Sequence, residues 1–164
     1  MGKELSIFEH IERLIPGFHG YKNKELLRED DRLVRGKVAE ILGQAKRELE
    51  RALQRCVMVN CQQLMGIENL RKKLMMLQSR ILHAEAGYRG YFDRIKFKEE
   101  ELRKLIQYDY MMIDKAQSIL EDAKALNSAV ADPSRLGMAV LNLEDKLNEL
   151  ETIVSNRMSF VVGE

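Results

Sequence analysis

Apolar residues recur at three- and four-residue steps through most of the chain, and four long stretches of this kind predict four long helices. The expected ranges are 22–56, 62–86, 98–127 and 133–158, preceded by a short amphipathic helix over 4–15. The last range has the most regular heptad, formed by Leu136, Val140, Leu143, Leu147, Leu150 and Val154. Such spacing is typical of helices that pack along one apolar seam.

Short connections between long helices favour neighbours that run in opposite directions, so we expect an all-α, antiparallel bundle of four long helices. The 164 residues are expected to form one elongated domain over 1–164. Two helix boundaries have clear signals in the sequence. Pro16 ends the short helix, and Asp132-Pro133 combines a capping residue with a proline in the first helical position.

The connection between the first two long helices is poorly marked, because residues 56–63 contain neither glycine nor proline. A turn in which Asn60 caps the next helix and an unbroken helix both fit this segment. Within the preceding helix, Gly36 and Gly43 each lower helix propensity by about 1 kcal/mol relative to alanine. Close approach of a neighbouring backbone or a mild bend would account for these two glycines.

Two segments far apart in the sequence share a glycine-aromatic pattern, Gly17-Phe18-His19-Gly20-Tyr21 and Gly87-Tyr88-Arg89-Gly90-Tyr91. If the helices alternate in direction, both corners lie at the same end of the bundle. One interpretation is structural, because glycines permit tight corners and aromatic rings close the end of a bundle. The other is a recognition surface, because tyrosine and arginine are enriched at interfaces. Its candidate binding residues are Phe18, His19, Tyr21, Tyr88, Arg89, Tyr91, Asp93 and Arg94.

The segments 15–21 and 87–93, together with Lys24-Glu25 and Arg28-Glu29, resemble a group of small all-helical prokaryotic proteins without an assigned function. The similarity covers about residues 10–125. The resemblance implies a helical fold and a cytoplasmic setting, and it implies no catalytic residues.

Asp109 interrupts the apolar face of the third long helix at a position that should point inward. A buried carboxylate needs a cation or hydrogen-bond donors nearby. We expect an arginine or a tyrosine hydroxyl from a neighbouring helix to supply them.

Four methionines predict adaptable packing or a face for a partner: Met58, Met65, Met75 and Met76. Methionine in a helical stripe more often fills gaps in a core than it forms a binding surface. Cys56 and Cys61 match neither a C-x-x-C redox pair nor a zinc site. We interpret them as two reduced, partly buried thiols of a cytoplasmic protein. No apolar run approaches the ~20 residues of a membrane span.

The near-neutral net charge of +1 conceals an asymmetry, because residues 1–104 carry +6 and residues 105–164 carry −5. Opposite charges on the two parts favour pairing between helices inside the fold. The sequence has no H-E-x-x-H, no nucleophile elbow, no Walker loop and no Glu-x-x-His pair. We therefore predict a protein that is not an enzyme, with no cofactor and no metal.

The leading functional hypothesis is a helical scaffold or adaptor that acts through protein–protein contacts, through the end with the two corners. The partner is another protein, or a second copy bound through the Leu136–Val162 region. The alternative is binding of nucleic acid or an anionic surface through the basic residues Arg47, Arg51, Arg55, Arg71, Lys72 and Lys73. Interspersed Glu48 and Glu50, together with the low net charge, make nucleic acid the weaker hypothesis.

Overall fold

The computed structural model describes residues 2–22, 26–84 and 98–162, and every regular element among them is an α-helix. The five helices are α1 (Gly2–Leu14), α2 (Leu27–Val59), α3 (Leu64–Leu82), α5 (Glu99–Ser128) and α6 (Pro133–Val162). The prediction of an all-helical chain is confirmed. The second glycine-aromatic corner, residues 87–94, lies outside the described residues.

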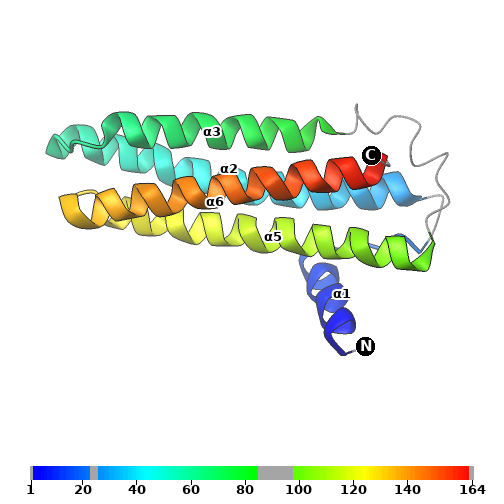
Figure 1. The fold of residues 1–164 in the computed structure, drawn as a ribbon. Coiled ribbons are helices and arrows are strands. Elements are labelled where there is room, and N and C mark those ends of the chain that lie inside the picture. Colours follow the sequence, from blue (N-terminus) through cyan, green and yellow to red (C-terminus); the bar gives the residue numbers. More distant parts are fainter. Residues whose placement is uncertain (1, 23–25, 85–97, 163–164) are drawn as a thin grey trace.

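The four long helices lie side by side, and α1 projects from the side of this bundle (Figure 1). Helix α2 packs extensively against α3 and α5, α5 also packs against α6, and α6 touches α3 more lightly. Their apolar faces form one shared core, which includes Leu42, Leu74, Ile113 and Leu147. Because these residues are fully buried, apolar burial is the main force that holds the helices together.

Polar pairs between helices define the register of the bundle. Between α5 and α6, Asp122 pairs with Lys146 at 2.9 Å and Lys115 pairs with Glu149. Between α3 and α6, Arg80 donates a hydrogen bond of 3.0 Å to the hydroxyl of Ser155. These exposed or partly exposed pairs each add little stability, but together they disfavour a shift of one helix along another.

The connection at 56–63 is a turn. Helix α2 continues to Val59, and Asn60 adopts a left-handed conformation with φ 53°. The backbone N–H of Asn60 donates to the carbonyl of Val57, so Asn60 caps the end of α2. The prediction that Asn60 caps the next helix is therefore wrong, because α3 begins only at Leu64.

Helix α6 begins at Pro133 as predicted, and the carboxylate of Asp132 accepts the backbone N–H of Arg135 at 3.3 Å. The helix extends beyond the predicted end at 158, to Val162. Val161 is buried and the ring of Phe160 packs 5.5 Å from that of Tyr108. Residues 160–162 thus continue α6 along the bundle and pack against it.

Two glycines of α2 differ in their surroundings. A Cβ at Gly36 would meet no atom within 4 Å, so close approach of a neighbour does not explain this glycine. A Cβ at Gly43 would lie 3.1 Å from the side-chain nitrogen of Gln78. That amide donates to the carbonyl of Ala39 at 2.9 Å, so the space at Gly43 admits a polar contact between α2 and α3.

Candidate functional site

A buried polar cluster joins the first glycine-aromatic corner to the four long helices. We define this cluster as Tyr21, Asp30, Asp31, Arg35, Asp109 and Arg157. None of its members is more than 3% exposed. Since burying charged groups is costly unless they are paired, their mutual contacts decide what this arrangement can do.

The corner is held by Asp30, in the first turn of α2. Its two carboxylate oxygens accept the backbone N–H groups of His19 at 3.0 Å and Tyr21 at 2.9 Å. The backbone turns sharply here, with positive φ at Gly17, Gly20 and Tyr21. A left-handed conformation is unfavourable for tyrosine, so the hydrogen bond to Asp30 helps to stabilise it.

This corner directs the side chain of Tyr21 into the bundle. The Tyr21 hydroxyl donates a hydrogen bond of 2.5 Å to Oδ2 of Asp109, on α5. The other carboxylate oxygen of Asp109 accepts from Nε of Arg157, on α6, at 2.7 Å. Asp109 thus receives one hydrogen bond from the corner and one from the last helix, which supplies both kinds of partner expected for a carboxylate at this position.

Arg157 connects Asp109 to α2. Its Nη2 donates to Oδ1 of Asp31 at 2.7 Å and lies 3.3 Å from the Tyr21 hydroxyl oxygen. The second oxygen of Asp31 accepts from Nε of Arg35 at 2.8 Å. Arg35 also donates to the carbonyls of Ile81 and Leu82, at the end of α3. The cluster therefore links the corner, the start of α2, the end of α3, α5 and the end of α6.

Burial and pairing act in opposite directions on the titration of this cluster. Burial raises the pKa of Asp109, although the charge of Arg157 and the hydrogen bond from Tyr21 act to lower it. The pKa of Tyr21 is raised well above its ordinary value, first by burial and then by the negative charge of Asp109. The Tyr21 hydroxyl therefore stays protonated and remains a donor over the whole neutral range.

The structure places the predicted binding residues of the first corner in two environments. Phe18 and Tyr21 are buried, at 4% and 1% exposure, so neither contributes to an exposed surface. His19 is exposed. The rings of Phe18 and Tyr21 meet edge to face at 5.4 Å, an arrangement that closes the end of the core. The other candidates, Tyr88, Arg89, Tyr91, Asp93 and Arg94, lie outside the described residues.

Sequence reasoning missed four members of the cluster, Asp30, Asp31, Arg35 and Arg157. A signal was present for each of them, because they occupy apolar-stripe positions. Arg157 follows Leu150 and Val154 at the next seam position of α6, and it precedes Val161. A polar residue at a seam position indicates either a side chain that fixes the register between two helices or a buried polar pair.

No protein-family description matches this chain, and neither the curated proteins nor the solved structures give a significant match.

The cluster has a structural role, because it holds the first corner and the long helices together. All six residues are buried and make hydrogen bonds within the chain, so among the described residues the cluster presents no exposed polar group. Among the residues described, no group of three or more His, Cys, Asp or Glu side chains is placed to bind a metal ion. None of the helices, in the part of the chain that the structure describes, has the length and apolar character needed to cross a bilayer.

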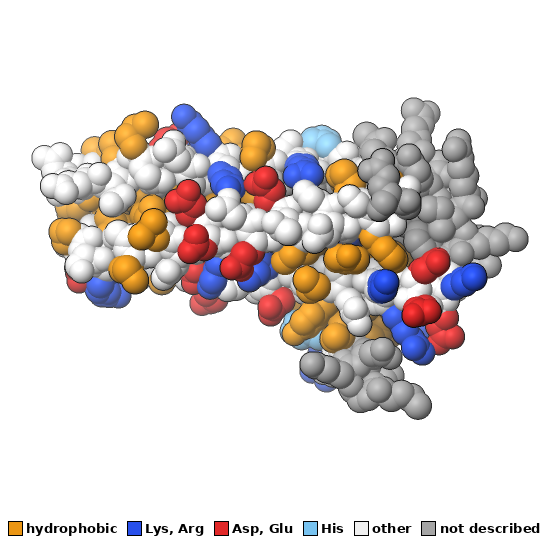
Figure 2. All heavy atoms as spheres, in the orientation of Figure 1, with side chains coloured by type: hydrophobic (Ala, Val, Ile, Leu, Met, Phe, Trp, Pro, Cys, Tyr) orange, Lys and Arg blue, Asp and Glu red, His pale blue; other side chains and the backbone are white. Residues whose placement is uncertain are grey.

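Exposed apolar residues gather at the opposite end of α2 and α3. We define the apolar turn patch as the five large side chains that flank the α2–α3 turn, with their exposed fractions: Val57 (64%), Met58 (84%), Val59 (52%), Leu64 (40%) and Met65 (67%). Figure 2 shows hydrophobic side chains at this left-hand end of the molecule. Met58 and Met65 therefore do not fill the core, and Met75 and Met76 are also exposed.

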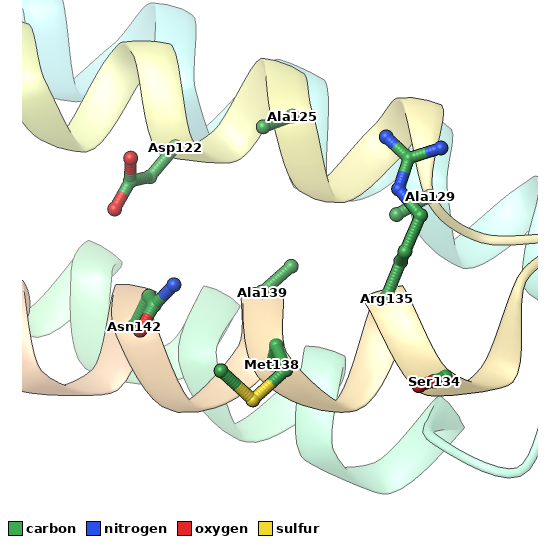
Figure 3. A pocket seen from close by; sticks show the side chains of 8 residues that line it. All are labelled: Asp122, Ala125, Ala129, Ser134, Arg135, Met138, Ala139 and Asn142. Atoms are coloured by element: carbon green, nitrogen blue, oxygen red, sulfur yellow. The ribbon is translucent and has the colours of Figure 1, made fainter.

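Two grooves lie at this end of the bundle. One lies between the α2–α3 turn and the α5–α6 turn, where Val59, Cys61, Val130 and Leu136 are among the lining residues. The other lies between α5 and α6, with Met138 and Arg135 on one side and Asp122 on the other (Figure 3). Met138 is 61% exposed, so α6 adds apolar surface at the same end of the bundle.

The basic residues proposed for an anionic ligand are largely engaged within the chain. Arg51 pairs with Glu48 at 2.7 Å, and Arg71 pairs with Glu68 at 2.8 Å. Arg55 donates to the backbone and side-chain oxygens of Asn127, on α5. These contacts direct the cations toward neighbouring acidic and amide groups, which lowers the positive potential that a phosphate backbone would meet.

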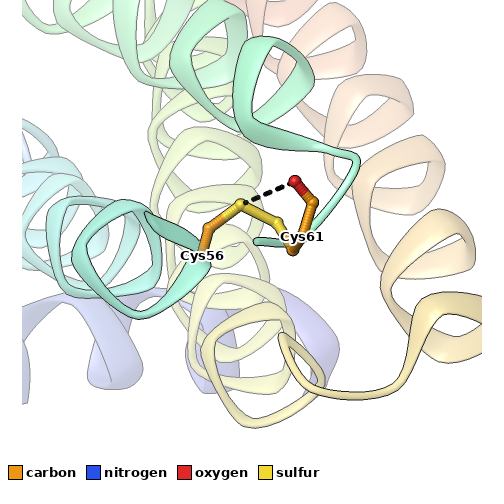
Figure 4. The surroundings of a disulfide bond; sticks show 2 residues. All are labelled: Cys56 and Cys61. Atoms are coloured by element: carbon orange, nitrogen blue, oxygen red, sulfur yellow. Dashed lines mark hydrogen bonds between the residues drawn. A yellow bond between two sulfur atoms is a disulfide. The ribbon is translucent and has the colours of Figure 1, made fainter. Parts of the chain in front are cut away.

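The structure joins Cys56 and Cys61 in a disulfide bond across the α2–α3 turn (Figure 4). The expectation of two reduced thiols is wrong for this conformation. The spacing of five residues matches no redox motif. The two cysteines meet because the left-handed Asn60 turns the chain back toward the end of α2.

Proposed function

We propose that this protein is a non-enzymatic helical scaffold or adaptor that binds a protein partner through the apolar turn patch. The long helices form an antiparallel bundle in one domain, and the protein acts in the cytoplasm. The single observation that carries the proposal is the group of five large apolar side chains exposed around one turn. Isolated exposed apolar residues are ordinary, but a group of them marks an interaction surface.

The location of the patch differs from the corner end suggested by sequence. The rings of Phe18 and Tyr21 are buried in the corner, whereas Met58 and Met65 are largely exposed. Methionine suits a partner-binding surface because its unbranched, polarizable side chain adapts to different apolar faces. A partner with an apolar face would remove this surface from water, which is the dominant favourable term in association.

The seam of α6 is used inside the chain. Leu143, Leu147 and Leu150 are fully buried, so a second copy cannot bind through these residues while the bundle is intact. Self-association through the Leu136–Val162 region would instead use the exposed Met138 and Leu141. This surface lies at the same end of the bundle as the apolar turn patch, and a second copy is therefore one identity for the partner.

The test compares two glutamate variants of the full chain. The patch variant is Met58→Glu with Met65→Glu, and the control is Met76→Glu with Met111→Glu, which changes exposed methionines outside the patch. Affinity purification from the native cell identifies partners, and light scattering after size-exclusion chromatography measures self-association. We expect the patch variant to lose a partner, or a dimer, that the control retains.

Helical content measured by circular dichroism must be equal in the two variants. Identical partners and identical molar mass for wild type, patch variant and control would overturn the proposal, because they would show that the patch is not used.

A further inference from the structure

We propose that Cys56 and Cys61 form a site of reversible thiol–disulfide exchange, at which a small thiol such as glutathione, or a dithiol, attacks the sulfur of Cys61. This inference concerns chemistry at the α2–α3 turn and does not depend on the proposed partner-binding function. Three features of the turn support this site: its backbone, the surroundings of the two cysteines and the unequal exposure of these two residues.

The backbone brings the two cysteines together by itself. The N–H of Cys61 donates to the carbonyl of Cys56 at 2.9 Å, and the N–H of Asn60 donates to the carbonyl of Val57. The Cα atoms of the cysteines lie 4.8 Å apart, within the range that a disulfide spans. Since these hydrogen bonds do not involve the sulfur atoms, the same turn accommodates the disulfide and the two thiols.

The reduced state also has a hydrogen-bond acceptor in place. The Cys56 sulfur lies 3.6 Å from the carbonyl oxygen of Cys61, as the dashed line in Figure 4 marks. A disulfide sulfur has no proton, so this contact becomes a hydrogen bond only when Cys56 is a thiol. In the same backbone conformation, the oxidised state therefore has the disulfide bond and the reduced state has the hydrogen bond from the Cys56 thiol.

The disulfide closes only a short segment. The two cysteines are five residues apart, and the loop-closure contribution of a disulfide increases with the length of the loop. The large core formed by α2, α3, α5 and α6 does not depend on this bond. We therefore expect the chain to stay folded in both states, which is a requirement for reversible exchange in the native protein.

The two cysteine residues differ in exposure. Cys56 is 1% exposed and belongs to the core, whereas Cys61 is partly exposed. Cys61 also lines the groove between the two turns, together with Gln62, Val130 and Pro133. An incoming thiolate can approach Cys61 through this groove, and Cys56 is the sulfur that leaves.

Reduction of the Cys56–Cys61 disulfide then takes two steps. The thiolate attacks the Cys61 sulfur, a mixed disulfide forms, the Cys56–Cys61 bond breaks, and its electron pair leaves on Cys56, which takes a proton from solvent. A second thiolate attacks the reductant's sulfur in the mixed disulfide and releases Cys61 as a thiolate. Two reductant thiols are oxidised to a disulfide while two cysteines are reduced, and oxidation by a small disulfide is the reverse.

The first experiment equilibrates the full chain in mixtures of reduced and oxidised glutathione, followed by acid quenching, alkylation and mass spectrometry. We expect one reversible two-electron transition between the disulfide and the dithiol, with unchanged helical content by circular dichroism. A chain that stays a dithiol in oxidised glutathione, or a disulfide that resists reduction until the chain unfolds, would overturn the proposal.

The second experiment tests the direction of attack with Cys56→Ser and Cys61→Ser, each of which leaves one thiol. The partly exposed Cys61 of the first variant should form a mixed disulfide with oxidised glutathione at least about tenfold faster than the buried Cys56 of the second. In denaturant the two rates should become similar. Equal rates in the folded variants, or faster reaction of Cys56, would contradict attack at Cys61.

Discussion

The hydroxyl of Tyr21 donates a hydrogen bond of 2.5 Å to the carboxylate of Asp109, although 88 residues separate the two. Both residues are buried, at 1% and 0% exposure. The bond joins a loop residue in a left-handed conformation to the middle of the apolar face of α5. Because Asp109 also binds Arg157, this one contact couples the position of the corner to the packing of α5 and α6.

Removing the Tyr21 hydroxyl should destabilise the fold while leaving the ring in place. In Tyr21→Phe, Asp109 loses one of its donors and remains buried, which should cost about 1–3 kcal/mol of unfolding free energy. Urea denaturation followed by circular dichroism measures this change. Tyr108→Phe is the matched control, because Tyr108 is only partly buried and its ring contact with Phe160 is retained. If Tyr21→Phe and Tyr108→Phe lost the same unfolding free energy, the coupling between the corner and the packing of α5 and α6 would be contradicted.

Arg157 is expected to be among the most sensitive positions in the chain. Arg157→Met keeps an unbranched side chain but leaves the carboxylates of Asp31 and Asp109 without this cation. Breaking a buried pair on one side costs about 3–5 kcal/mol. Lys146→Met breaks the partly exposed pair with Asp122, which should cost about 0–1 kcal/mol. Urea denaturation of the two variants should therefore give well-separated midpoints. Similar midpoints would show that the cluster does not hold the helices together.

The raised pKa of Tyr21 predicts a loss of stability in alkali. The unfolded chain releases this proton near the ordinary value of 10.0, whereas the buried hydroxyl keeps it to higher pH. The folded state thus binds more protons above that value, and the unfolding free energy falls as pH rises. Below it, the contribution of this group is fully present.

Tyr21→Phe isolates this effect, because all other groups titrate in both proteins. The difference in unfolding free energy between wild type and Tyr21→Phe should be constant at neutral pH and should shrink as pH rises above about 10. Tyrosinate absorbance gives a second measurement. Before alkaline unfolding the two proteins should show the same absorbance change, and after it wild type should show one tyrosine more.

The hydrophobic pattern was sufficient to predict an all-helical chain, because heptad spacing determines which faces must be buried. The start of α6 was predicted at Pro133, where the capping carboxylate and the proline act locally. The end of α6 was predicted at 158, because the apolar residues 160–162 could equally form a tail that folds back or meets another subunit. Packing of Val161 into the core decides this, and such packing depends on other helices.

The buried polar cluster was only partly predictable. Asp109 interrupted an apolar stripe, which indicated a buried carboxylate, but the sequence alone did not identify Tyr21 and Arg157 as its partners. Those residues lie 88 and 48 positions away, and their contact depends on how three helices and a corner are placed together. The disulfide was missed because its geometry depends on the left-handed backbone of Asn60 rather than on cysteine spacing.

Two glycine substitutions should change stability in opposite directions. In Gly20→Ala the new methyl group would collide with the ring of Phe8, and the backbone has φ +65°, which disfavours any side chain. Strain of this kind costs about 1–3 kcal/mol. In Gly36→Ala the methyl group meets no atom within 4 Å, and alanine raises the helix propensity of α2, which should add about 0.5–1 kcal/mol. Both effects are measured as shifts of the urea midpoint, with Tyr21→Phe in the same series.

Gly20→Ala is expected to differ from Gly36→Ala because Gly20 lies in the first corner. Gly20 precedes Tyr21, so displacement of the backbone at Gly20 should also weaken the bond between Tyr21 and Asp109. The double variant Gly20→Ala/Tyr21→Phe should therefore lose less stability than the sum of the single losses. Additive losses would show that Gly20 acts only through its contact with Phe8, and that the position of the Tyr21 hydroxyl is determined by Asp30 and the helices.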